Sequence, residues 1–270
     1  MVKKLFKHEL LSYTRFLIPV YIALLGTATL TRAVQFFETD TAAFIAVMIS
    51  SIIVFCICVF AATLLTQIVA IVRFYKHLFT SEGYLTFTLP VKVSQHIFVK
   101  LASSVIVIML TSLIVSLSIG ITLSSELGLE LFKAGMYLFE ILVDKIGAHV
   151  FFYIIEFAIL MVVATTTAML LFYTCLTLGQ LAKKNRVLLA VGIYFGYNFA
   201  VQFISSFFSV GFGVLSVTSD VIQTFTNFID TNPLEFFHII FITNIVWNAI
   251  LGVVFYFITH KVMKNKLNLE

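Results

Sequence analysis

The sequence predicts an all-helical, polytopic membrane protein, and three observations lead to this fold class. Hydrophobic residues make up 61% of the 270 residues and charged residues only 11%, against about 25% charged in an ordinary soluble domain. The apolar residues gather in six long runs, and lysine and arginine are confined almost entirely to alternate connections between them. Too little polar surface remains to cover a water-soluble globule, so we expect lipid to solvate the chain.

The six apolar runs are long enough to cross a bilayer as helices. They cover residues 16–35, 43–72, 97–123, 149–181, 187–215 and 236–260. A hydrocarbon core of about 30 Å needs about 20 helical residues. The runs lack the period-2 alternation of a membrane barrel, and backbone amides cannot stay unpaired in hydrocarbon. We therefore expect six transmembrane helices.

The basic residues predict how the spans are oriented. If both termini are cytoplasmic, 14 of the 17 lysines and arginines lie on the inner side, and only Arg32, Lys133 and Lys145 lie outside. An excess of Lys and Arg in cytoplasmic connections sets the orientation of helical membrane proteins. The net charge of +4 then reflects membrane topology, and no nucleic-acid partner is expected.

The chain is expected to form one membrane domain, residues 1–270, with four segments outside the spans. Residues 1–15 place Lys4, Lys7, His8, Ser12 and Arg15 on one helical face and Phe6, Leu10, Tyr13 and Leu17 on the other. This pattern predicts an amphipathic helix in the cytoplasmic interface, although a simple basic anchor would also fit. Residues 73–96 form a cytoplasmic loop, and residues 124–148 and 216–235 are extracellular, the first as an acidic amphipathic helix.

The cytoplasmic loop between the second and third spans is unusually apolar. Turn or helix-start residues come first, followed by an aromatic and aliphatic group and a proline: Thr80, Ser81, Glu82, Gly83, Tyr84, Leu85, Phe87, Leu89 and Pro90. Exposed apolar patches commonly mark partner interfaces. The loop therefore either binds a partner protein or tucks its apolar side chains under the helices.

A few polar side chains interrupt the spans. Glu156 lies about two turns from the outer end of the fourth span, so it is either functional, as charge at depth usually is, or close enough to the surface to reach water or a hydroxyl. Asn198, Gln202 and Ser205 give the fifth span a polar face, and Asn244 and Asn248 do the same for the sixth. Such faces either join helices or line a substrate route. Gly192 and Gly196 have the spacing that permits close helix approach.

Recognisable catalytic motifs are absent from the sequence. There is no G-x-x-x-x-G-K-[ST] phosphate loop and no H-E-x-x-H, and the six histidines are scattered without ligand spacing. The three cysteines lie inside predicted spans and are expected to be packing residues. We expect no catalytic, cofactor-binding or metal-binding residues and no enzymatic activity on this chain.

Two segments carry a resemblance to a known family. RFYKHLFTSEGYLTFTLPVKVSQ, Arg73 to Gln95, and LGQLAKKNR, Leu178 to Arg186, resemble segments in small six-span permeases of ATP-binding-cassette exporters from Gram-positive bacteria. The similar proteins belong to the clostridial group related to bacitracin and lantibiotic self-protection transporters. The six-span plan agrees along essentially the whole chain, while only these two short motifs are at all specific.

The resemblance implies a partner, a coupling segment and a mechanism. Two copies of a separately encoded ATPase, which binds ATP and Mg, would dock on the interfacial helix and on residues 80–90, and a second permease subunit would complete a homo- or heterodimer in the bacterial plasma membrane. The cargo would be amphipathic or apolar, such as an antimicrobial peptide. The alternatives are a substrate-binding membrane subunit of an importer, and a membrane receptor or scaffold without transport.

Overall fold

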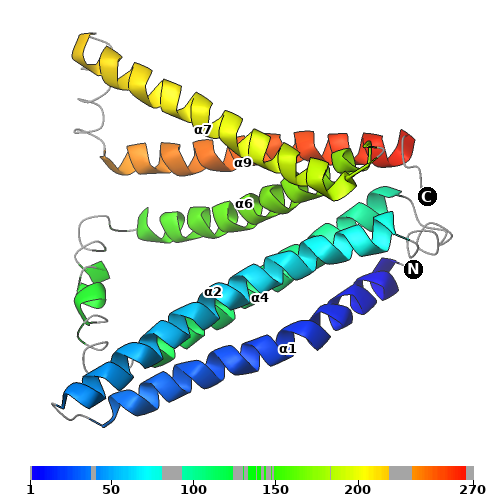
Figure 1. Ribbon diagram of the computed structural model, residues 1–270. Helices are drawn as coiled ribbons and strands as arrows, with labels where there is room; N and C mark the ends of the chain where they lie inside the picture. Colours follow the sequence, from blue (N-terminus) through cyan, green and yellow to red (C-terminus); the bar gives the residue numbers. More distant parts are fainter. Residues whose placement is uncertain are drawn as a thin grey trace. The chain divides into compact units, whose positions relative to one another are not determined.

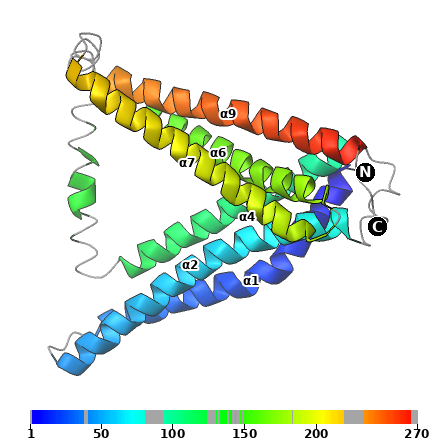
Figure 2. The same cartoon turned by 45° about the horizontal axis from the view of Figure 1, so that its top comes forward.

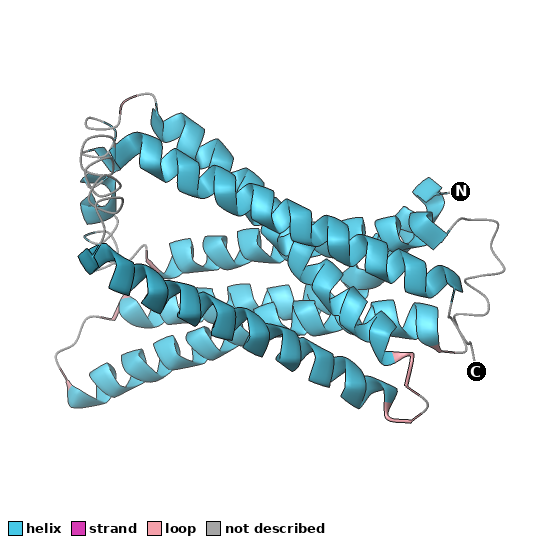
Figure 3. Ribbon diagram, turned by 90° about the horizontal axis from the view of Figure 1, so that it is seen from above, coloured by secondary structure: helices cyan, strands magenta, loops and turns pink. Residues whose placement is uncertain are grey.

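The protein is described by a computed structural model that covers most of the chain. It describes residues 2–37, 41–80, 93–123, 130, 133–137, 139–140, 143, 147, 149–182, 184–218 and 233–265, with the backbone alone for 208–218, 233 and 265. Within these ranges the regular structure is entirely helical, without a strand (Figure 3). The chain divides into two compact units, Met1–Gly147 and Ala148–Glu270, and each is described by itself.

Unit 1 is built from three long helices. These are α1 (Val2–Gln35), α2 (Ala42–Phe79) and α4 (Val93–Thr122), each packed against the other two (Figure 1). Leu24, Ala28, Phe55 and Ala62 form a buried apolar cluster between α1 and α2. A hydroxyl network adds polar contacts between the helices: Tyr21 Oη lies 2.6 Å from Thr111 Oγ1, and Thr66 Oγ1 lies 3.2 Å from the same atom.

Unit 2 is built around α6 (His149–Gly179), which packs against both α7 (Arg186–Thr218) and α9 (Pro233–Asn265) (Figures 1 and 2). Threonine hydroxyls of α6 donate to backbone carbonyls of α9. Thr167 Oγ1 donates to Asn248 O at 2.8 Å, and Thr174 Oγ1 lies 3.1 Å from Phe255 O. A side chain at Gly252 would lie 3.0 Å from Thr167 Oγ1, so the glycine permits this close approach.

The turn between α6 and α7 depends on two special backbone positions. A Cβ at Gly179 would lie 2.7 Å from Arg186 O and 2.8 Å from Ala190 Cβ. Asn185 has a positive φ of 56° just before α7 begins, and asparagine is among the residues that tolerate this conformation best. By contrast, nothing lies within 4 Å of a Cβ built at Gly192 or Gly196. No described residue makes the close approach that their spacing permits.

The prediction of six helices with span character is confirmed. All six helices are long and apolar enough to cross a membrane. Large apolar side chains stand exposed along them, including Phe60, Phe199 and Phe257. In water such surfaces would be costly, whereas in a bilayer they face lipid.

Two boundaries differ from the sequence prediction. Residues 73–79 continue α2 and residues 93–96 begin α4, so the loop predicted over 73–96 is shorter at both ends. Residues 2–15 are helical as expected, but α1 runs without a break into the first span. Tyr13 and Leu17 of the predicted apolar face are buried, and Lys4, Lys7, His8 and Arg15 of the predicted polar face are exposed. Phe6 and Leu10 of the first face and Ser12 of the second are all half-buried. Placement of this helix in the interface stays a prediction.

The predicted outer segments fall mostly outside the described residues. Within 124–148, residues 130, 133–137, 139–140 and 143 are helical. Of the segment 216–235, residues 216–218 belong to α7 and 233–235 to α9, and residues 219–232 lie outside the described ranges.

Candidate functional site

A buried ionic cluster joins the three helices of unit 1. Glu9 of α1, Arg73 of α2 and Lys100 of α4 are only 6%, 7% and 5% exposed. Lys100 Nζ lies 3.1 Å from Glu9 Oε1, and Arg73 Nη2 lies 3.4 Å from the same oxygen. One carboxylate oxygen therefore faces two cations from two other helices. Buried charges are costly unless they are paired in this way.

Neighbouring side chains complete the cluster. Arg73 Nη1 donates to Ser12 Oγ, and the guanidinium lies over the Tyr13 ring, 4.4 Å from its centroid. His77 Nδ1 lies 3.0 Å from Lys100 Nζ and 3.6 Å from Glu9 Oε2. An ammonium group can only donate, so His77 Nδ1 accepts from Lys100, and 3.6 Å is too long for a hydrogen bond to Glu9. The cluster thus has defined donors and acceptors.

The cluster lies close to the helix ends that flank residues 80–92. Arg73 is six residues before the end of α2, and Lys100 is seven residues after the start of α4, which is about 9–10 Å along each helix. Glu9 is equally near the start of α1. At 34 residues α1 is about 51 Å long, well beyond the about 30 Å of a hydrocarbon core. Its charged first turns need not enter the hydrocarbon.

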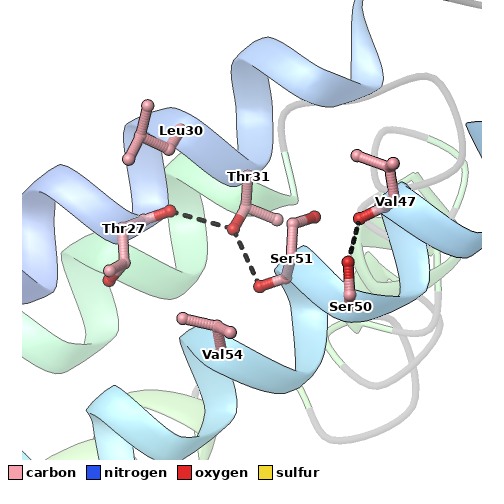
Figure 4. Close-up of a pocket in the computed structure, with 7 residues that line it drawn as sticks. All are labelled: Thr27, Leu30, Thr31, Val47, Ser50, Ser51 and Val54. Atoms are coloured by element: carbon pink, nitrogen blue, oxygen red, sulfur yellow. Dashed lines mark hydrogen bonds between the residues drawn. The ribbon is translucent and has the colours of Figure 1, made fainter.

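Two grooves run between α1 and α2. One, of about 310 Å³, is lined at its polar end by Ser12, Arg73 and Lys76. The other, of about 200 Å³, lies near the opposite end of the helices and is shown in Figure 4. There Thr31 Oγ1 donates to Thr27 O of its own helix at 2.9 Å and lies 3.2 Å from Ser51 O of α2. Ser50 Oγ donates to Val47 O. These hydroxyls are satisfied by backbone, so the second groove offers a ligand little polar recognition.

Unit 2 contains a second polar cluster, around Glu156. His238 Nδ1 lies 2.8 Å from Glu156 Oε1, and His149 Nδ1 lies 3.1 Å from His238 Nε2. Tyr153 stacks on His238 with ring centroids 4.3 Å apart and donates its hydroxyl to Leu234 O at 2.7 Å. The partner of Glu156 is therefore an imidazole of α9, which neither interpretation of the sequence named. The contacts fix α6 against α9 at the ends where these helices begin.

The other predicted route residues are mostly exposed. Asn198, Gln202, Ser205 and Asn244 are exposed, and Asn248 is half-buried. Asn198 Nδ2 donates to Tyr194 O, Asn244 Nδ2 to Ile240 O and Asn248 Nδ2 to Asn244 O, each one turn back along its own helix. None of these hydrogen bonds joins the polar faces of α7 and α9, and the part of these faces in a route stays a prediction.

Of the predicted docking residues, only Thr80 is described. It caps the end of α2, and its hydroxyl donates to Lys76 O. The other members, Ser81, Glu82, Gly83, Tyr84, Leu85, Phe87, Leu89 and Pro90, lie outside the described residues.

Sequence reasoning missed both clusters, because their members are far apart in the chain. Glu9 and Lys100 are separated by 91 residues, and His149 and His238 by 89. The sequence contained one signal for the first cluster. Glu9 lies on the same helical face as Tyr13, and the other residues of that face are apolar, so a buried carboxylate could have been predicted there. No group of three or more His, Cys, Asp or Glu residues able to hold a metal ion occurs in the described ranges.

Six span-length apolar helices place the chain in the class of all-helical proteins compatible with a multi-pass membrane location. Comparison with protein-family models, curated proteins and solved structures found no match.

Proposed function

We propose that this chain is the membrane-spanning permease subunit of an ATP-binding-cassette exporter. It moves or extracts an amphipathic or apolar compound, such as an antimicrobial peptide, using ATP that two copies of a separate ATPase bind with Mg and hydrolyse. The observation that carries the proposal is the Glu9 cluster, which ties the end of α2 and the start of α4 to α1.

This arrangement suits a coupling device. A docking loop at residues 80–90 would join the two helix ends that the cluster holds, so a push on the loop would act on α1, α2 and α4 together. Close-packed protein interiors are nearly incompressible and transmit strain. Movement of the loop is therefore transmitted as a shift of whole helices between two accessibilities, with direction set by the different affinities of cargo and nucleotide for the two states.

The charge pattern and the resemblance support the orientation in this proposal. Fourteen basic residues against three favour cytoplasmic termini, and residues 80–90 would then lie on the side where ATP is available. A second copy, or a related subunit, would face the exposed amides of Asn198, Gln202 and Asn244. The amide nitrogens of Asn198 and Asn244 donate one turn back along their own helices, which leaves their acceptor oxygens for cargo.

Co-purification tests the proposal. The tagged full chain, extracted from its native membrane in mild detergent, should bring down a Walker-type ATPase whose hydrolysis is measured in the eluate. Glu82→Lys with Phe87→Ala should abolish this association and leave membrane insertion intact. The matched control is Glu130→Lys with Phe139→Ala, since both residues are exposed and lie in the segment expected outside.

Normal ATPase recovery with the loop variant would contradict the docking assignment. Absence of any nucleotide hydrolase from the wild-type eluate, together with saturable uptake of a small ligand, would favour the importer-type binding subunit instead.

A further inference from the structure

The larger groove of unit 1 has two chemically different ends. Phe16 of α1 and Ile68 and Val72 of α2 form an apolar wall, and Ser12, Arg73 and Lys76 form the polar end. Ile68 and Lys76 are eight residues apart on one helix, which is about 12 Å. The groove, of about 310 Å³, therefore runs along α2 from the membrane-facing part of the helix toward its charged end.

The apolar wall is open to the surroundings of the helices. Phe16, Ile68 and Val72 are each exposed, so lipid chains rather than water would reach this part of the groove if α1 and α2 cross the bilayer. An acyl chain laid along the wall would cover these three side chains.

The polar end of the groove holds a donor of Arg73 that is not satisfied by the described residues. Arg73 is 7% exposed, and its Nη atoms contact Ser12 and Glu9, yet its Nε–H is buried and has no hydrogen-bond partner among the described residues. Unmet donors of this kind are rare, because leaving one buried costs free energy. The exposed side chain of Lys76 adds a second cation one turn before the end of α2.

We propose that this groove binds a phospholipid with a net negative charge, its phosphate pairing with Lys76 and the Arg73 guanidinium at the polar end, and one acyl chain lying on Phe16, Ile68 and Val72. Basic pockets between transmembrane helices take up anionic head groups in this way, and guanidinium groups suit phosphate oxygens. Free phosphate would leave the apolar wall uncovered. The site does not depend on the proposed transport function.

A fluorescence experiment tests the site. The chain has one tryptophan, Trp247, which is replaced by phenylalanine, and Phe16→Trp then reports lipid at the groove. The purified full chain is placed in vesicles that contain phosphatidylglycerol or phosphatidylcholine with brominated acyl chains, which quench a tryptophan that they touch. Phe60→Trp, on an exposed part of α2 away from the groove, is the matched reporter for bulk lipid.

The expected result is stronger quenching by brominated phosphatidylglycerol than by brominated phosphatidylcholine at position 16 and equal quenching at position 60. Lys76→Gln should weaken the preference at position 16 about fivefold, the effect of one basic residue on an anionic lipid. Lys7→Gln, another exposed lysine of unit 1, should leave it unchanged. Inorganic phosphate at millimolar concentration should not compete.

Three outcomes would overturn the proposal: equal quenching by both lipids at position 16, the same preference at positions 16 and 60, or displacement of the lipid by inorganic phosphate. Since Lys76 is exposed, its replacement removes no packing. A preference that survives both Lys76→Gln and Lys76→Glu would also count against the site.

Discussion

Glu9 has the most constrained environment among the acidic side chains of unit 1 that the structure describes. Its Oε1 faces Lys100 at 3.1 Å and Arg73 at 3.4 Å, and all three residues are buried. Removing one member of a buried ion pair leaves the remaining charge without compensation, which costs more than the pair itself contributes. The same carboxylate therefore controls the packing of both partner helices.

Glu9→Gln should lower the free energy of unfolding by about 3–5 kcal/mol, the usual cost of breaking a buried pair. Adding Lys100→Met should restore part of the loss, because one of the two cations facing Glu9 is then gone. Thermal or denaturant unfolding in detergent micelles measures both effects. Glu130→Gln, at an exposed position, should change nothing. Equal stability of Glu9→Gln and Glu130→Gln would show that water already solvates the cluster.

At the scale of elements, the helices were predictable and their contacts were not. An apolar run of about 20 residues predicts a span because lipid leaves the backbone no other solution. The predicted ends were displaced where polar residues continue a helix beyond the hydrocarbon, as Arg73 and His77 do at the end of α2. The contact between Glu156 and His238 depends on how α6 packs against α9, and the residue pattern within each helix does not predict that packing.

Glycine also shows why spacing alone misleads. Gly192 and Gly196 have the spacing of a helix-packing motif, yet no described atom lies within 4 Å of a Cβ built at either. By contrast, a Cβ built at Gly179, which no motif marks, would lie 2.7 Å from the backbone oxygen of Arg186 in α7. Contact is set by the turn that brings α7 back along α6. The spacing of small residues shows where a close helix contact is possible, but it does not show whether the folded chain makes that contact.

Gly179→Ala and Gly192→Ala should have opposite effects on stability. The new methyl at position 179 would lie 2.7 Å from Arg186 O, and overpacking of this kind costs about 1–3 kcal/mol. At position 192 the methyl meets nothing, and alanine favours a helix over glycine by about 1 kcal/mol. Unfolding of both variants under identical micelle conditions makes the comparison. A large loss at Gly192 instead would indicate a contact with a second copy.

At the scale of the whole molecule, the orientation follows from the distribution of charge along the sequence. The six helices give an even number of crossings, so both ends of the chain fall on one side if all six span. The 14-to-3 distribution of basic residues then predicts that this side is the cytoplasm. The packing of helices within each unit is the same for either orientation of the chain across the membrane. The orientation therefore needs a test of its own.

Cysteine labelling in intact bacterial cells provides that test. In a background without Cys56, Cys58 and Cys175, single cysteines replace Lys7, Glu130 and Lys184, all of which are exposed, so that burial does not limit their reaction. A membrane-impermeant maleimide should label Glu130→Cys in intact cells and label Lys7→Cys and Lys184→Cys only after lysis. Labelling of Lys7→Cys and Lys184→Cys on opposite sides would mean that one of the first four helices does not span. The reverse pattern at all three positions would invert the orientation, place residues 80–90 outside, and remove the ATPase from reach of its proposed docking loop.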